Sequence, residues 1–132
     1  MLAKIKAHRR TKEVIATALE PFNLTLTEWL LLAAVQDAQS KILSSQLAQE
    51  LQVSAPLVSR FVNQLDNKGY LKSEVSNDDK REKNIQLSPK GSAVLDDSEP
   101  AVREALRQWL APVAHEHVEI YINVLLQIAY KL

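Results

Sequence analysis

Hydrogen-bonding and cationic side chains gather in a short segment that starts at Ser54. Its sequence, Ser-Ala-Pro-Leu-Val-Ser-Arg, is typical of a helix start, because Ser54 can accept from the first free amides and Pro56 needs no amide partner there. The guanidinium of Arg60 can donate two hydrogen bonds to guanine, and side chains near a helix N-terminus can reach bases or phosphates in the major groove. The candidate DNA-contacting residues are Ser54, Pro56, Leu57, Ser59, Arg60, Asn63 and Gln64.

Two short helices joined by a tight connection must position these side chains. The first is predicted to have Ser44 or Ser45 as its cap and to end at Leu51. The second continues to Lys68, where Gly69 can adopt the left-handed conformation that ends many helices. Its apolar stripe consists of Leu57, Val58, Phe61, Val62 and Leu65. This pair of helices is typical of a helix-turn-helix.

A polar hairpin follows directly. Apolar and polar residues alternate over residues 71–76 and 84–88, which predicts two strands. The sequence between them, Asn-Asp-Asp-Lys-Arg-Glu, suits a solvent-exposed loop, and its cations Lys80 and Arg81 are further candidate DNA-contacting residues. Residues 42–43 could add a very short strand. A helix-turn-helix with such a hairpin is a winged helix, in which the hairpin is the wing.

Two helices are also predicted before this unit. Apolar residues recur at helical spacing from Ala3 to Leu19, and Pro21 disfavours helix at the residue before it. The sequence Thr-Leu-Thr-Glu from Thr25 is a capping box, in which threonine accepts from the amide three residues on and glutamate reaches back. It opens a helix that extends to about Asp37.

A long helical region is predicted after the hairpin. Ser88 and Pro89 form its cap and first turn, and interruptions are expected at Pro100 and Pro112. Apolar residues in the last helix recur at three- and four-residue steps, in a stripe broad enough to pack against another helix. Because this helix lies outside the helix-turn-helix, we expect a second copy of the chain to cover it. The predicted dimer-interface residues are Ile5, Val118, Tyr121, Val124, Leu125 and Ile128.

Composition excludes several classes of protein. The 132 residues include no cysteine, which excludes disulfides, thiolate nucleophiles and cysteine zinc sites, and two glycines cannot form a glycine-rich phosphate loop. A metal or hydrolytic site would need carboxylates at ligand spacing beside the three histidines, so neither a metal site nor an enzyme is expected. The longest apolar run, Trp29 to Val35, is far below the ~18 residues of a membrane helix, and we expect a cytoplasmic protein.

Charge is sorted along the chain although 16 Lys+Arg balance 16 Asp+Glu. Residues 1–13 carry five cations against one anion, net +4, and residues 54–91 carry seven against five, net +2. Residues 14–53 and 92–132 are each net −3. The predicted winged helix is therefore mildly basic within a neutral chain, which predicts few phosphate contacts and weak nonspecific binding to DNA.

Two longer motifs extend this pattern. The segment from Leu47 to Leu71 is LAQELQVSAPLVSRFVNQLDNKGYL, and the segment from Asp78 to Gly91 is DDKREKNIQLSPKG. The first resembles the helix-turn-helix of the multiple antibiotic resistance regulator (MarR) family, with its Val-Ser-Arg core and Lys-Gly-Tyr-Leu exit. The second is similar to the wing signature of that family, with Asp-x-Arg followed by an alternating strand and a helix start.

The resemblance to the MarR family implies roles for several residues. Arg81 would insert into the minor groove, and Asp79 would help to hold the wing. Members of the family commonly bind small aromatic or anionic effectors between the dimerisation helices and the DNA-binding lobe, which would place His8, Arg9 and Trp29 near such a crevice.

The resemblance also implies an arrangement of the whole chain. Residues 1–22 and 92–132 would form dimerisation helices around a DNA-binding lobe of residues 23–91, all in a single domain of residues 1–132. The expected fold is mainly α with a small β-hairpin wing, that is, a winged helix-turn-helix flanked by N- and C-terminal dimerisation helices.

The expected function follows from this fold. We expect a transcriptional regulator that binds double-stranded DNA sequence-specifically as a homodimer on a pseudo-palindromic operator, without a cofactor. It would be a repressor that a small ligand releases. The alternative is a winged-helix module that contacts another protein instead of DNA, which the zero net charge favours. Nonspecific DNA binding at low salt discriminates between the two.

Overall fold

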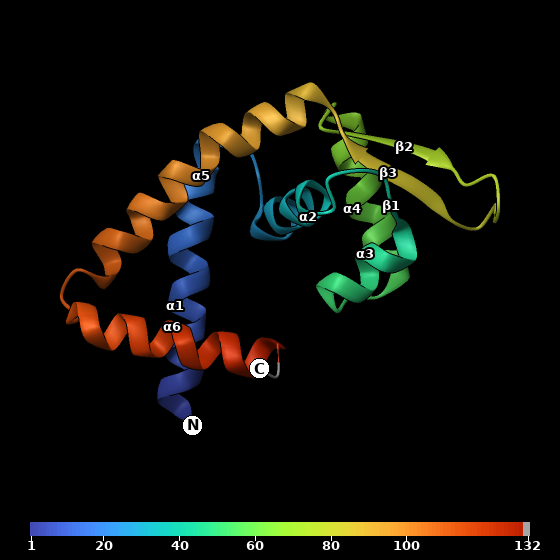
Figure 1. Ribbon diagram of the computed structural model, residues 1–132. Helices are drawn as coiled ribbons and strands as arrows, with labels where there is room; N and C mark the ends of the chain where they lie inside the picture. Colours follow the sequence, from blue (N-terminus) through green and yellow to red (C-terminus); the bar gives the residue numbers. More distant parts are fainter. Residues whose placement is uncertain (131–132) are drawn as a thin grey trace.

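Six α-helices and a three-stranded sheet make up the computed structural model, which describes residues 1–130 (Figure 1). The expected fold, mainly α with a small hairpin wing, is confirmed. In chain order the elements are α1 (Leu2–Leu19), the 3-10 helix η1 (Glu20–Phe22), α2 (Leu26–Asp37), β1 (Ile42–Leu43), α3 (Ser44–Leu51), α4 (Ala55–Asn67), β2 (Leu71–Val75), β3 (Lys83–Leu87), α5 (Pro89–Leu110) and α6 (His115–Tyr130).

Side-chain caps start two of the helices as their sequences predict. The Glu28 amide donates to Thr25 Oγ1 at 3.2 Å and the Thr25 amide donates to Glu28 Oε1 at 3.1 Å, which completes the capping box of α2. Ser88 Oγ accepts from the Gly91 amide at 3.0 Å and caps α5. Local sequence therefore determines where the helices on both sides of the helix-turn-helix begin.

The sheet has the strand order β1-β3-β2, and both pairings are antiparallel. Leu71 lies opposite Leu87, and Val75 opposite Lys83, so β2 and β3 form the predicted hairpin. The predicted short strand is also present, with Ile42 opposite Ile85. We call residues 71–87 the wing. Its loop projects away from the long helices in Figure 1.

One apolar core connects the flanking helices to the helix-turn-helix. The helix α1 packs along α5, and both helices contribute to the same buried cluster as α3, α4 and the sheet. The position of α4 is therefore set by the long helices as well as by its nearest neighbours. The buried apolar residues are Leu19, Leu24, Leu31, Leu32, Val35, Leu47, Ala48, Val58, Val62, Leu65, Leu71, Ile85, Leu95 and Val102.

The expected interruption at Pro100 is wrong, because α5 is continuous through this residue. Proline removes one helical hydrogen bond, and its ring crowds the carbonyl of the residue four positions earlier. Where packing holds the helix together, these effects bend the helix and do not end it. Pro100 is on the exposed side of α5, and the helix follows an arc in Figure 1. The predicted break at Pro112 is confirmed, since it lies between α5 and α6.

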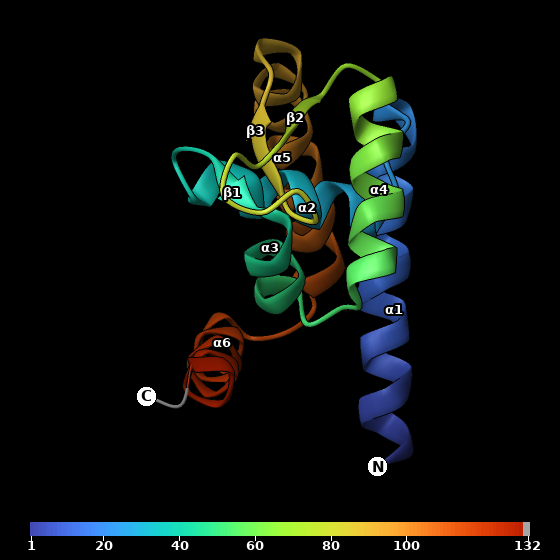
Figure 2. The same ribbon diagram turned by 90° about the vertical axis from the view of Figure 1, so that its right-hand side faces the viewer.

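The helix α6 and the N-terminal half of α1 lie away from the wing. Figure 2 shows α6 apart from α1, although the two overlap in Figure 1. Most of the large apolar side chains between residues 115 and 128 of α6 are exposed, with fractions from 44% for Leu125 to 71% for Ile128, whereas Val118 is half-buried. Within residues 1–130, the helices are too short or too polar to cross a membrane.

Candidate nucleic-acid interface

The helix α4 starts as the sequence predicts and turns one face to solvent. Ser54 Oγ accepts from the Leu57 amide at 3.4 Å, and a proline occupies the first turn. Val58, Val62 and Leu65 are buried, so the opposite face is free to meet a ligand. The exposed candidates are Ser54, Pro56, Ser59, Arg60, Asn63 and Gln64, whereas Leu57 is half-buried.

Arg60 is held close to its own helix. Its guanidinium carbon lies 5.2 Å from the centre of the Phe61 ring, within the range of a cation–π contact. Such a contact at an exposed site is weak, so Arg60 can exchange it for a stronger bidentate hydrogen bond to a base.

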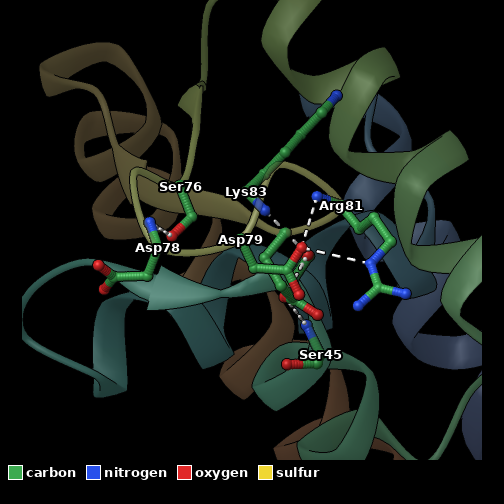
Figure 3. Close-up of polar contacts among 8 residues, drawn as sticks. Ser45, Ser76, Asp78, Asp79, Arg81 and Lys83 are labelled. Carbon is green, nitrogen blue, oxygen red and sulfur yellow. Dashed lines mark hydrogen bonds and ion pairs between the residues drawn. The ribbon is translucent and has the colours of Figure 1, made fainter.

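The tip of the wing is organised by Asp79, which the resemblance predicts as wing support. Asp79 Oδ1 accepts from the Arg81 amide at 2.9 Å and from Arg81 Nε at 3.3 Å (Figure 3). The remaining guanidinium nitrogens of Arg81 are available, because its side chain is 91% exposed. Lys80 beside it is also exposed. The loop therefore presents two cations to solvent.

The base of the wing is bound to α3 by Glu82. Glu82 Oε2 accepts from Ser44 Oγ at 3.0 Å and from the Ser45 amide at 3.1 Å. These hydrogen bonds, first from the Ser45 amide and then from the Ser44 hydroxyl, hold the pKa of Glu82 below its ordinary value. The prediction that Ser44 or Ser45 caps α3 is wrong: Leu43 is the N-cap residue, and the carboxylate comes from Glu82.

The wing is also tied to α4. Lys83 Nζ donates to Asn63 Oδ1 at 3.3 Å, and Ser73 Oγ donates to Asp66 Oδ2 at 2.9 Å. Lys83 extends toward α4 in Figure 3. Both strands of the hairpin are thus linked to the helix that carries the candidate base-reading residues.

A hollow of about 310 Å³ lies where α3, α4 and the wing meet. Pro56 and Ser59 line it from α4, and Arg81 and Lys83 line it from the wing. The start of α4 and the cations of the wing therefore lie on one face of the molecule. The structure brings together the sequence-predicted Pro56, Ser59 and Arg81, although more than 20 residues of chain separate Arg81 from the two residues of α4.

Two comparisons bear on this arrangement. The sequence model of the MarR family matches residues 22–82, from η1 to the tip of the wing. A cysteine-to-serine mutant of MarR from Escherichia coli, solved in complex with operator DNA, has the same fold with a TM-score of 0.85 at 17% identity, over 96% of this chain and 90% of that chain. Over residues 22–82 the chain is similar to the MarR family, and it shares the fold of the solved MarR structure.

Two further solved structures are similar to this chain. A probable transcriptional regulator from Pseudomonas aeruginosa is 27% identical, with a TM-score of 0.83 over 96% of this chain and 94% of that chain. CouR from Rhodococcus jostii, solved with bound p-coumaroyl-CoA, is 17% identical, with a TM-score of 0.80 over 98% of this chain and 88% of that chain.

Sequence reasoning missed two residues of this candidate interface, Glu82 and Lys83. The residues of the first turn of α3 are neutral, and helix N-termini favour an acidic partner, so a carboxylate from elsewhere in the chain was to be expected there. Nothing in the local sequence indicates which carboxylate supplies it, because Glu82 is 37 residues from Ser45.

The predicted effector residues of this MarR-like chain lie on two helices. Trp29 is half-buried in α2, and its Nε1 donates to Ser98 Oγ of α5 at 3.1 Å. His8 and Arg9 are exposed on α1. A groove of about 680 Å³ between α1 and α5 is lined by other residues, Trp109 among them. A role of His8, Arg9 and Trp29 in effector binding stays a prediction.

Metal ligands do not gather in the described part of this MarR-like chain. Within residues 1–130, His, Asp and Glu form no group of three or more that could hold a metal ion. His115 Nε2 instead lies 3.2 Å from Glu119 Oε1 along α6, at the surface.

Proposed function

We propose that this protein is a repressor that binds a pseudo-palindromic DNA operator as a homodimer and that a small ligand releases. In each subunit, residues 23–91 act as the DNA-binding lobe, with α4 in the major groove and the wing in the adjacent minor groove. Arg60 reads guanine, and Arg81 enters the minor groove.

The observation that carries this proposal is the common face of α4 and the wing. The N-terminal turn of α4 and the cation Arg81 line the same hollow, so both can meet one duplex. Each element alone presents only a few side chains, which is too little for a specific site. The relative from Escherichia coli that shares the fold was solved with operator DNA, which supports this use of the surface.

The proposed homodimer rests on the surface of α6. The predicted residues Tyr121, Val124, Leu125 and Ile128 are exposed, and so are Ile120, Ile122 and Leu126, which the predicted stripe does not include. A helix that is apolar on more than one side is normally buried. Ile5 of α1 is also 51% exposed, whereas Val118 is half-buried. We therefore assign residues 1–22 and 92–132 to dimerisation.

A small aromatic or anionic effector completes the proposal. The support is indirect: CouR, which shares the fold, was solved with p-coumaroyl-CoA, a ligand with an aromatic group and anionic phosphates. A ligand that binds the DNA-free form better than the DNA-bound form shifts the protein away from DNA by that difference in affinity.

Selection of bound sequences from a random pool of duplex DNA tests the proposal. We expect one two-fold-symmetric sequence to be enriched, with half-sites about one helical turn apart. The affinity for that sequence should fall steeply with salt, by about −0.9 in the log–log slope for each phosphate contact. A protein that enriches no sequence and binds no duplex at low salt would instead support the protein-interaction alternative.

A further inference from the structure

The N-terminus of α3 takes its carboxylate from the wing. The first amides of a helix have no intrahelical acceptor, and the helix dipole favours a negative charge beside them. Glu82 Oε2 meets this need by accepting from the Ser45 amide at 3.1 Å and from Ser44 Oγ at 3.0 Å. A side chain of the wing thus contributes to the N-terminal cap of the first helix of the helix-turn-helix, where Gln46 Oε1 also accepts from the Leu43 amide at 3.1 Å.

The backbone around Glu82 is fixed as well. The Ser76 amide donates to the Glu82 carbonyl at 2.9 Å, and the Glu82 amide donates to the Asp79 carbonyl at 3.0 Å, which closes the loop of the wing. The Lys83 amide donates to Ser44 Oγ at 3.2 Å, so the Ser44 hydroxyl accepts from Lys83 and donates to the Glu82 carboxylate. Glu82 therefore connects two rigid parts, the closed loop and α3.

Arg81 immediately precedes this connection. Its ion pair is with Asp79, two residues away in the same loop, so that pair shapes the tip but does not place it relative to α4. Contacts from the strands and the base of the wing do so, through Glu82 to α3 and through Lys83 and Ser73 to Asn63 and Asp66 of α4.

The charge of Glu82 makes its position informative. A carboxylate beside the hollow between α4 and the wing faces the surface that DNA phosphates would approach, and electrostatics alone makes it unfavourable there. If Glu82 positions the wing, its removal should weaken DNA binding. If only its negative charge matters, its removal should strengthen DNA binding, so a substitution distinguishes the two effects.

We propose that Glu82 is a positioning residue for DNA recognition: by capping α3 it holds the wing at a fixed place relative to α4, so that Arg81 and α4 engage the same duplex. The role rests on the proposed DNA-binding function. Glu82 contacts no base in this role and acts through the placement of Arg81.

Three variants test whether Glu82 positions the wing. For each variant, the affinity for the selected operator is measured and compared with that of wild type. Glu82→Ala removes the acceptor, and we expect the affinity to fall about tenfold or more, since a hydrogen bond to a charged acceptor is worth about that factor. Glu82→Gln keeps an acceptor without the charge and should bind much closer to wild type. Glu74→Ala, on β2, removes an exposed carboxylate of the same wing and should bind as tightly as wild type or slightly more tightly.

A double variant shows whether the effect passes through Arg81. If Glu82 acts by placing Arg81, adding Glu82→Ala to Arg81→Ala should weaken binding much less than Glu82→Ala does alone. Hydrogen exchange in the DNA-free protein gives a second readout, because the Ser45 amide should lose protection in Glu82→Ala and retain it in Glu74→Ala.

The outcomes separate this role from the function on which it rests. A wild type that binds no duplex overturns the proposed function and this role together. In a wild type that binds, Glu82→Ala at or above wild-type affinity overturns the role alone and would mean that the carboxylate competes with a DNA phosphate for α3. Fully additive losses with Arg81→Ala, or unchanged protection of Ser45, also overturn it.

Discussion

Lys68 Nζ lies 2.9 Å from Glu28 Oε2, which joins the C-terminal end of α4 to the first turn of α2. The Glu28 side chain is only 5% exposed, and Lys68 also donates to the carbonyl of Asn23 at 2.8 Å. Burial acts to raise the pKa of Glu28. The hydrogen bond and charge of Lys68 and the hydrogen bonds of Thr25 outweigh the effect of burial, so the pKa of Glu28 is lowered. The ion pair therefore holds α4 in place at the end opposite its candidate base-reading residues.

Replacement of Lys68 should destabilise the fold in a pH-dependent way. Lys68→Ala leaves a buried carboxylate without its partner, and we expect a loss of about 1–3 kcal/mol in the free energy of unfolding at neutral pH. Because the folded pKa of Glu28 is below its unfolded value of about 4.3, the stabilisation is present above that pH and is lost as the pH falls through the folded pKa.

Urea unfolding of the two proteins at several pH values measures this difference. The variant should show a smaller loss of stability than wild type when the pH falls below about 4. Lys72→Ala, which removes an exposed cation from β2, is the control and should change little. Equal pH dependence in Lys68→Ala and wild type would contradict the assignment.

Loss of Arg60 should weaken binding and relax one base preference. Arg60→Ala is expected to cost roughly 1–3 kcal/mol on the preferred operator, because a bidentate contact to guanine supplies both affinity and discrimination. Titration of operators that differ at each position measures both effects. Arg103→Ala removes an exposed arginine from α5 and should leave DNA binding intact. Uniform weakening on every sequence would instead assign Arg60 to a phosphate.

Loss of Arg81 should affect the flanks of the operator. An arginine in the minor groove responds to groove width and to A·T content more than to a unique base. Arg81→Ala should therefore weaken DNA binding and change the base preference only outside the major-groove half-sites. Titration of operators that differ at each position measures both effects. A folded Arg81→Ala protein that binds like wild type would show that the wing does not enter the groove.

Removal of residues 113–132 should abolish the dimer. The truncated chain lacks the exposed apolar surface of α6, so we expect monomers or aggregates that no longer bind a two-fold-symmetric site. Analytical ultracentrifugation and operator binding measure the two effects. The dimer proposal does not survive a truncated protein that is soluble, monomeric and fully active on DNA.

Gly91→Ala should destabilise the protein although alanine favours helices. Gly91 lies in the first turn of α5, where an added Cβ would overlap the carbonyl oxygen of Tyr70. Overpacking against backbone costs about 1–3 kcal/mol, more than the gain in helix propensity. Thermal unfolding measures the loss, with Ser92→Ala as the neighbouring control. A stabilised Gly91→Ala protein would mean that α5 moves away from Tyr70 at little cost.

Local signals in the sequence were sufficient for most of the elements. The capping box at Thr25, the serine cap at Ser54 and the alternation over residues 71–76 each depend on residues within a few positions of one another, and the structure has the helix or strand that each predicts. Pro100 shows the limit of such reasoning, because packing of α5 against α1 and α2 outweighs the local preference to end a helix.

The sequence by itself determined the winged-helix order of the elements and the candidate contacts of α4, since these depend on periodicity and caps, and its resemblance to the MarR wing signature indicated the pair Asp79 and Arg81. Only the tertiary structure decided that Glu82 caps α3, that Lys68 pairs with Glu28 and that Trp29 donates to Ser98. The reason is physical: these contacts join residues 37 to 69 positions apart, and an unpaired amide or carboxylate specifies the chemistry of its partner but not its place in the chain.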